Sequence, residues 1–238
     1  MRNIKLEIEY DGMNFYGWEI QPHKRTVRGV LESELESILQ EKIKLTCGAR
    51  TDTGVHAISQ IANFKTETKI TPRKLKQALL HLPQDVCVKS VNDMPLKFNA
   101  HFDAVSRTYL YKLVIGKSPI RRYGIWEYKF PLDIERIKSV LPLFLGKHRF
   151  DFFASKDEGE CDIKTLKIVQ KKNDNVFEIC ADHFLRKMIR LIVGTLTEFG
   201  RGYLREKDIQ DAIDCKKNAR KFLSAPPQGL YLKEIKYK

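Results

Sequence analysis

The chain has 238 residues, of which 42% are hydrophobic and 31% charged, with no low-complexity segment. This composition excludes a disordered protein and predicts one large globular domain or two smaller ones. The formal net charge of +13 is uneven: residues 1–103 carry 15 Lys and Arg against 13 Asp and Glu, whereas residues 104–238 carry 28 against 17. The basic second half indicates an anionic partner, for which nucleic acid is the leading candidate and a basic surface kept for solubility the alternative.

The cysteines and the hydropathy pattern indicate the compartment. The five cysteines are scattered and form no C-x-x-C pair, which argues against a disulfide framework and a zinc site. No apolar stretch approaches membrane-spanning length, and the first residues alternate with charges instead of forming a signal peptide. We therefore expect a cytoplasmic protein that binds neither metal nor membrane.

The first half shows alternating strand and helix patterns. Ile4, Leu6 and Ile8 alternate with charged residues, as in a strand with one buried face. Thr26 is placed to cap a helix over 27–40. Further expected elements are strands at 43–45 and 61–64, a helix opened by Pro72, and a strand at 86–91. The order is β-α-β-α-β.

The second half repeats this order. The expected elements are a strand at 109–115, a helix at 133–145, strands at 165–170 and 176–181, a long helix at 184–199 and a final strand at 229–237. The fold class is therefore α+β: two similar β-α-β-α-β, ferredoxin-like halves, 1–103 and 104–238, joined into one extended, mainly antiparallel sheet. We expect helices on one side and a central cleft.

A loop in the first half carries the most reactive combination of residues. Asp52 follows Arg50 by two positions, and Gly54 lets the backbone turn closely against a bound group. A neighbouring guanidinium favours an ionised carboxylate, which can act as nucleophile or general base. The tripeptide Arg-Thr-Asp alone is a weak signal, because Asp and Thr in such loops are more often turn-forming residues.

The longer segment is more specific. Residues 48–57, Gly-Ala-Arg-Thr-Asp-Thr-Gly-Val-His-Ala, resemble the active-site motif of the TruA family of tRNA pseudouridine synthases. Other blocks resemble that family in the same order along nearly the whole chain. They are 10–12 with 15–18, 98–104 with 109–111, 184–194 with 200–202, and 225–232.

The resemblance implies a function. In that family the aspartate drives cleavage of the N-glycosidic bond of a uridine, and the uracil rotates and rejoins the ribose through carbon 5, at tRNA positions 38 to 40 in the anticodon stem-loop. Asp52 matches this aspartate; whether it attacks the sugar or promotes proton loss from it is left open. No cofactor is implied, and relatives that are homodimers imply a homodimer here.

The resemblance also implies substrate-binding residues. Arg50 would assist flipping of the uridine, Tyr109 would stack on the base, and Arg190 could pair with Asp52 across an RNA-binding cleft. Without the resemblance Tyr109 reads equally well as a cross-strand packing aromatic. His56 is expected to stabilise the loop rather than carry a proton. Further expected tRNA contacts are Arg73, Phe98, Asn99, Ala100, His101, Phe102, Lys117 and Lys164.

Several positions depart from the commonest family pattern. Glu19 and Arg28 each stand where Gln is usual, whereas His101 and Lys164 replace Arg in segments that contact tRNA in relatives. Losing the bidentate geometry of Arg affects recognition more than catalysis. Two other functions explain the sequence less fully. A non-catalytic RNA-binding or RNA-folding protein would explain the basic half but not the Arg-Thr-Asp loop, and a nuclease lacks the carboxylate cluster or His pair for metal-assisted cleavage.

Overall fold

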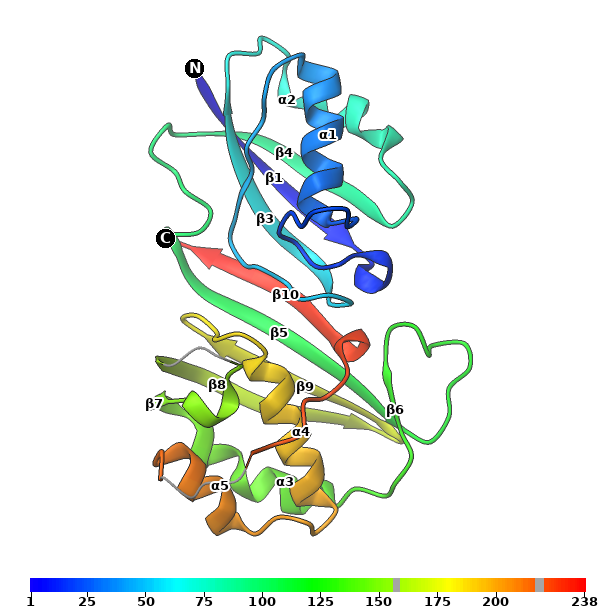
Figure 1. The fold of residues 1–238 in the computed structure, drawn as a ribbon, viewed down its shortest axis with the longest axis vertical. Helices are drawn as coiled ribbons and strands as arrows, with labels where there is room; N and C mark the ends of the chain where they lie inside the picture. The colour runs from blue at the N-terminus through cyan, green and yellow to red at the C-terminus, as the bar shows by residue number, and fades with distance from the viewer. Residues whose placement is uncertain (156–158, 217–220) are drawn as a thin grey trace. The chain divides into compact units, whose positions relative to one another are not determined.

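The computed structural model describes residues 1–155, 159–216 and 221–238 (Figure 1). Contacts between residues divide the chain into two compact units. Unit 1 comprises Met1–Val105 and Tyr231–Lys238, and unit 2 comprises Ser106–Leu230. The C-terminal strand thus groups with unit 1, whereas the sequence placed all of 104–238 in one half. The reason is local pairing, since Tyr231 and Leu232 lie in parallel register with His56 and Ala57.

Unit 1 is a mainly antiparallel sheet with helices packed on it. Its strands follow the order β4-β1-β3-β10, with β2 paired to β3. The elements are β1 (Arg2–Tyr10), α1 (Val27–Leu39), β2 (Thr46–Cys47), β3 (His56–Thr66), α2 (Pro72–Ala78), β4 (Val86–Met94) and β10 (Leu230–Tyr237). The predicted β-α-β-α-β order is confirmed. In Figure 1, α1 lies across the strands of this unit.

The helix α1 begins and packs as its sequence predicts. The Thr26 side chain accepts a hydrogen bond from the Gly29 N–H and so caps the first turn. Val27, Leu31 and Leu35 are fully buried at helical spacing, which fixes the face turned to the core.

The prediction of a strand at 43–45 is wrong, because this segment has no strand and β2 begins after it, at Thr46. The Ile43 N–H donates to the Glu36 carboxylate and the Leu45 N–H to the Glu32 carboxylate. These backbone donors therefore bind side chains of α1 and not a neighbouring strand.

Unit 2 also combines a mainly antiparallel sheet with helices. Its strand order is β5-β9-β8-β7, with the short β6 parallel to β5. The elements are β5 (Ala104–Ile115), β6 (Trp126–Tyr128), α3 (Ile134–Val140), β7 (Gly146–Arg149), β8 (Glu160–Lys171), β9 (Asp174–Ala181), α4 (Met188–Gly200) and α5 (Glu206–Ile213). β6, β7 and α5 were not predicted. The mixed α+β class with mainly antiparallel strands is confirmed.

The long helix differs from its prediction at the N-terminus. It begins at Met188 and not at 184, because Lys187 has a left-handed backbone with φ of 62°. Phe184 and Arg186 therefore precede the helix. Most of α4 is buried.

No helix in the described part of the chain is long and apolar enough to cross a membrane.

Candidate active site

The loop that carries Asp52 connects β2 to β3 and is fixed by the segment that follows β1. The buried Tyr10 hydroxyl lies 2.7 Å from the Thr51 Oγ1, and the Trp18 N–H donates to the Thr51 carbonyl over 3.0 Å. Burial raises the pKa of Tyr10 far above its usual range, so the phenol stays neutral as a hydrogen-bonding group. Thr51, next to Asp52, is thus held through both its side chain and its backbone.

A buried glutamine of β3 fixes the start of the same loop. The Gln60 Nε2 donates to the Ala49 carbonyl over 2.6 Å, and its Oε1 accepts from the Ala49 N–H over 3.3 Å. Gln60 is fully buried. Because a buried amide left unpaired costs about 1–3 kcal/mol, these two bonds make the loop position specific.

The end of the loop is equally constrained. The Val55 N–H closes a turn on the Asp52 carbonyl over 3.1 Å, and Gly54 has a φ of +77°, as the sequence predicted for a close turn. His56 is buried; its Nδ1 accepts from the Gly12 N–H over 3.1 Å and its ring stacks on Tyr231 with centroids 4.5 Å apart. These contacts support the structural role expected for His56.

The carboxylate of Asp52 lies at the centre of this rigid loop and is half-buried. Within unit 1, the described side chains form neither a hydrogen bond nor an ion pair with it. Arg50, the expected neighbour, instead pairs through its Nε with the Glu19 Oε1 at 2.9 Å, and its side chain is 71% exposed. The loop therefore presents an available carboxylate on a fixed backbone.

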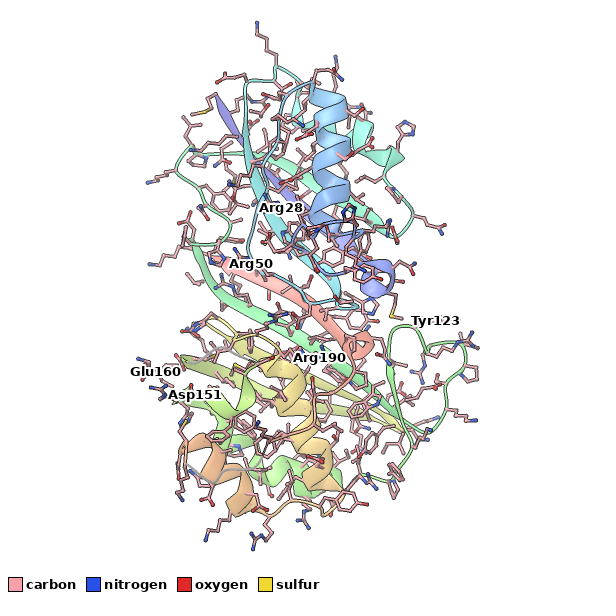
Figure 2. The ribbon with its side chains drawn as sticks, in the orientation of Figure 1. Arg28, Arg50, Tyr123, Asp151, Glu160 and Arg190 are labelled. Atoms are coloured by element: carbon pink, nitrogen blue, oxygen red, sulfur yellow. The ribbon has the colours of Figure 1, made fainter. Side chains whose placement is uncertain are left out.

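The other two expected substrate-binding residues belong to unit 2. Tyr109 lies in β5 opposite Ile179 of β9, is 7% exposed, and meets Phe184 edge to face with centroids 5.3 Å apart. Arg190, labelled in Figure 2, lies in α4, and its Nε donates to the Ala225 carbonyl over 2.7 Å. Their expected meeting with Asp52 stays a prediction.

The expected tRNA contacts divide by exposure. Arg73, His101, Lys117 and Lys164 are exposed, and Phe102 is 80% exposed. Phe98 and Ala100 are buried; Phe98 packs on Tyr237 with centroids 5.2 Å apart. Asn99 shapes the turn, because its Oδ1 accepts from the two N–H groups of His101 and Phe102. In this segment the expectation of a side-chain contact with tRNA therefore falls on His101 and Phe102.

Sequence reasoning missed the residues that support the loop. Gln60 could have been noticed as a polar residue next to the apolar strand segment 61–64. Glu19 and Arg28 were noticed only as departures from a family pattern, although opposite charges at two such positions can pair. Across the residues that the structure describes, no group of three or more His, Cys, Asp or Glu could hold a metal ion.

Comparison with known proteins finds similar sequences along the whole chain. A profile described as tRNA pseudouridine synthase matches residues 7–103 and 141–238. The tRNA pseudouridine synthase A of Thermoanaerobacter sp. (strain X514) is 39% identical over 246 residues, and that of Acetivibrio thermocellus is 36% identical over 244 residues; each alignment covers 100% of both chains. A solved Cbf5-Nop10-Gar1 complex contains a chain that is 12% identical, with a TM-score of 0.38, covering 97% of this chain and 58% of that one.

The family match over residues 7–103 and 141–238 makes the chain an RNA-modifying enzyme. The chain belongs to the tRNA pseudouridine synthase family, and it is an isomerase that forms pseudouridine in tRNA.

Proposed function

We propose that this enzyme converts uridine to pseudouridine in the anticodon stem-loop of tRNA, at position 38, 39 and/or 40, with Asp52 as the nucleophile. The observation that carries the proposal is the Asp52 loop: its backbone is fixed on both sides of a half-buried carboxylate that no described side chain of unit 1 binds. Such a carboxylate can reach a reacting atom without first breaking an ion pair within unit 1.

The reaction needs one charged group and no external reagent. The bond from the ribose carbon 1′ to uracil N1 breaks, and a bond from carbon 1′ to carbon 5 forms. Carbon 5 loses a proton and N1 gains one, so atoms and electrons balance. Asp52 can serve as the nucleophile at carbon 1′, and the same carboxylate also suits a route through proton loss from the sugar.

Flipping the target uridine out of the stem-loop costs roughly a few kcal/mol. We assign recovery of this energy to three side chains. Arg50 is exposed within the Asp52 loop and suits the space vacated by the base, Tyr109 offers a ring for stacking, and Arg190 offers a positive charge for the carboxylate.

The decisive experiment is to incubate the enzyme with unmodified tRNA and to map pseudouridine. We expect Asp52→Asn to lower single-turnover rates by at least about 1,000-fold, because the neutral amide cannot act as a nucleophile, while tRNA binding persists. Asp93→Asn is the matched control: it removes an exposed carboxylate that pairs with Arg2, and it should keep activity. Turnover that survives Asp52→Asn defeats the proposal.

A non-catalytic RNA-binding or RNA-folding protein is the second candidate, favoured by the basic composition of 104–238. Wild-type protein that binds tRNA but leaves every uridine unchanged would support it. Recovery of intact RNA from the same reactions separates both candidates from a nuclease.

The proposal includes a homodimer and a cytoplasmic location, where unmodified tRNA is available. Light scattering on the purified protein tests the first: the expected mass is twice the 27.8 kDa of one chain.

A further inference from the structure

Four charged side chains form a continuous network from the helix α1 to the Asp52 loop. The Glu19 Oε1 lies 2.9 Å from the Arg50 Nε, and the Glu19 Oε2 lies 3.1 Å from an Arg28 terminal nitrogen. Arg28 in turn donates from its Nε to the Glu32 carboxylate over 2.7 Å, one helical turn further along α1. Figure 2 labels Arg28 on α1 and Arg50 in the loop. Each oxygen of Glu19 thus binds a different arginine.

The network is rigid at one end and open at the other. The side chains of Arg28 and Glu32 are 16% and 12% exposed, and Glu32 also accepts the Leu45 N–H over 2.7 Å. Burial lowers the pKa of Arg28, but its bonds to Glu32 and Glu19 outweigh burial and the pKa is raised. Arg28 therefore stays charged and anchors Glu19, whereas the Arg50 side chain is 71% exposed.

The nitrogen of Arg50 that pairs with Glu19 determines which N–H groups of the guanidinium remain available to a substrate. An arginine has five N–H donors in a planar fork, and the nitrogen of Arg50 that lies against Glu19 is Nε. In the described part of the chain the two terminal nitrogens, with four donors, form no ion pair or hydrogen bond, so they can bind an anionic or carbonyl group of RNA. Holding the guanidinium by Nε also limits rotation of a side chain that would otherwise sample many rotamers.

We propose that Glu19 is a positioning residue: anchored by Arg28, it holds Arg50 by its Nε so that the terminal nitrogens of Arg50 face the RNA that enters the Asp52 loop. This inference rests on the proposed function for its catalytic consequence, since it assigns to Arg50 a contact with the substrate. The contact between Glu19 and Arg50 itself can be measured without RNA.

The first test uses the free protein. The Nε–H proton of Arg50, assigned by its loss in Arg50→Lys, should exchange slowly with water in wild type, because the proposal requires the adjacent Glu19 carboxylate to accept it. Glu19→Ala should accelerate this exchange at least about tenfold, whereas Glu19→Gln, whose amide oxygen can still accept, should have a smaller effect. Glu34→Gln, which removes a carboxylate of α1 that forms no ion pair in the described residues, is the matched control and should leave the signal unchanged. Equal exchange in wild type and Glu19→Ala overturns the proposal.

The second test is a double-mutant cycle under single-turnover conditions with unmodified tRNA. We expect Glu19→Ala to lower the rate about tenfold, Glu19→Gln to restore part of it, and Glu34→Gln to behave as wild type. In an Arg50→Ala background, Glu19→Ala should have no further effect, because no guanidinium is left to orient. A merely structural Glu19 would give the same loss in both backgrounds, and that result contradicts the inference.

The two failures are distinguishable. Full activity of Asp52→Asn would defeat the proposed function without touching the exchange result. An inactive Asp52→Asn together with additive losses for Glu19→Ala and Arg50→Ala would defeat the positioning role alone.

Discussion

Cys47 lies buried at the start of the Asp52 loop, close to the charges of Glu19, Arg50 and Arg28. Burial raises the pKa of its thiol to about 12, the negative charge of Glu19 adds to the rise, and the two arginines oppose it. A thiol in this state is protonated and unreactive near neutral pH. The loop therefore holds one potential nucleophile, the carboxylate of Asp52, and keeps the neighbouring sulfur inert.

The raised pKa of Cys47 predicts a loss of stability at alkaline pH. The thiol of the unfolded chain loses its proton near 9.0, whereas the folded one keeps it up to about 12. Between these values only the unfolded state releases the proton. The contribution of the Cys47 thiol to the free energy of unfolding is therefore fully present below pH 9 and is lost as pH rises toward 12.

Urea unfolding from pH 8 to 10.5 measures this effect. The free energy of unfolding should fall less steeply with pH in Cys47→Ala than in wild type, by up to about 1.4 kcal/mol per pH unit. Cys87→Ala removes an exposed thiol and should keep the wild-type slope. Parallel slopes in wild type and Cys47→Ala would contradict the assignment.

The position of the Asp52 loop depends on how closely the turn after β1 approaches it. A Cβ atom at Gly12 would lie 2.0 Å from the Val55 carbonyl oxygen, a backbone atom that cannot move without the loop. The Gly12 N–H also donates to His56, so the same residue joins the turn to both the loop and β3. The turn after β1 and the Asp52 loop therefore hold each other in place, although some 40 residues separate them in the chain.

We therefore expect Gly12→Ala to displace the loop. A shift of about 1 Å at the carboxylate can cost about 100-fold in rate, and forcing the segments apart should destabilise the fold by roughly 1–3 kcal/mol. Single-turnover rates and thermal melting, measured together, test both effects. Met13→Ala, which changes a neighbouring exposed side chain of the same turn, is the control. A Gly12→Ala enzyme with wild-type rates would show that the loop position is not set by this contact.

Sequence patterns predicted the helices and strands whose buried residues recur at regular spacing. They missed the features that depend on contacts with residues elsewhere in the chain. The strand Arg2–Tyr10 and the helix Val27–Leu39 bury alternate and helically spaced residues, so their patterns were sufficient. The prediction of a strand at 43–45 was wrong because carboxylates of α1 bind the backbone N–H groups of this segment. The predicted start of α4 was wrong because Lys187 adopts a left-handed backbone conformation, which hydrophobic periodicity cannot reveal.

The same division applies to the candidate site. The motif 48–57 identified Asp52, Arg50 and Gly54 from consecutive residues. The supports of the loop come from Tyr10 and Trp18, which lie far from Thr51 in the chain, and from Gln60 of β3, whose side chain binds the Ala49 backbone. Such contacts could not be predicted before the register of β1 with β3 was known.

At the scale of the whole molecule, charge is the property that the sequence predicts most directly. Residues 104–238 carry 28 Lys and Arg against 17 Asp and Glu, and several of these cations, including Lys117 and Lys164, are exposed. Cations that neutralise phosphates release condensed counterions, so the logarithm of affinity falls linearly with the logarithm of salt concentration. This dependence should be the same for wild type and Asp52→Asn, because the proposed function gives the carboxylate a role in the reaction and none in the long-range attraction.

The number of phosphate contacts can then be counted from the slope. Filter binding of unmodified tRNA from about 50 to 300 mM salt should give a slope for Lys117→Gln and Lys164→Gln together that is shallower than wild type by about 1–2, since each contact contributes roughly one ion. Lys44→Gln removes an exposed lysine outside the expected contacts and should keep the wild-type slope. A double variant that binds more weakly at every salt concentration with an unchanged slope would mean that these lysines act through shape or hydrogen bonding, and that other cations of 104–238 neutralise the phosphates.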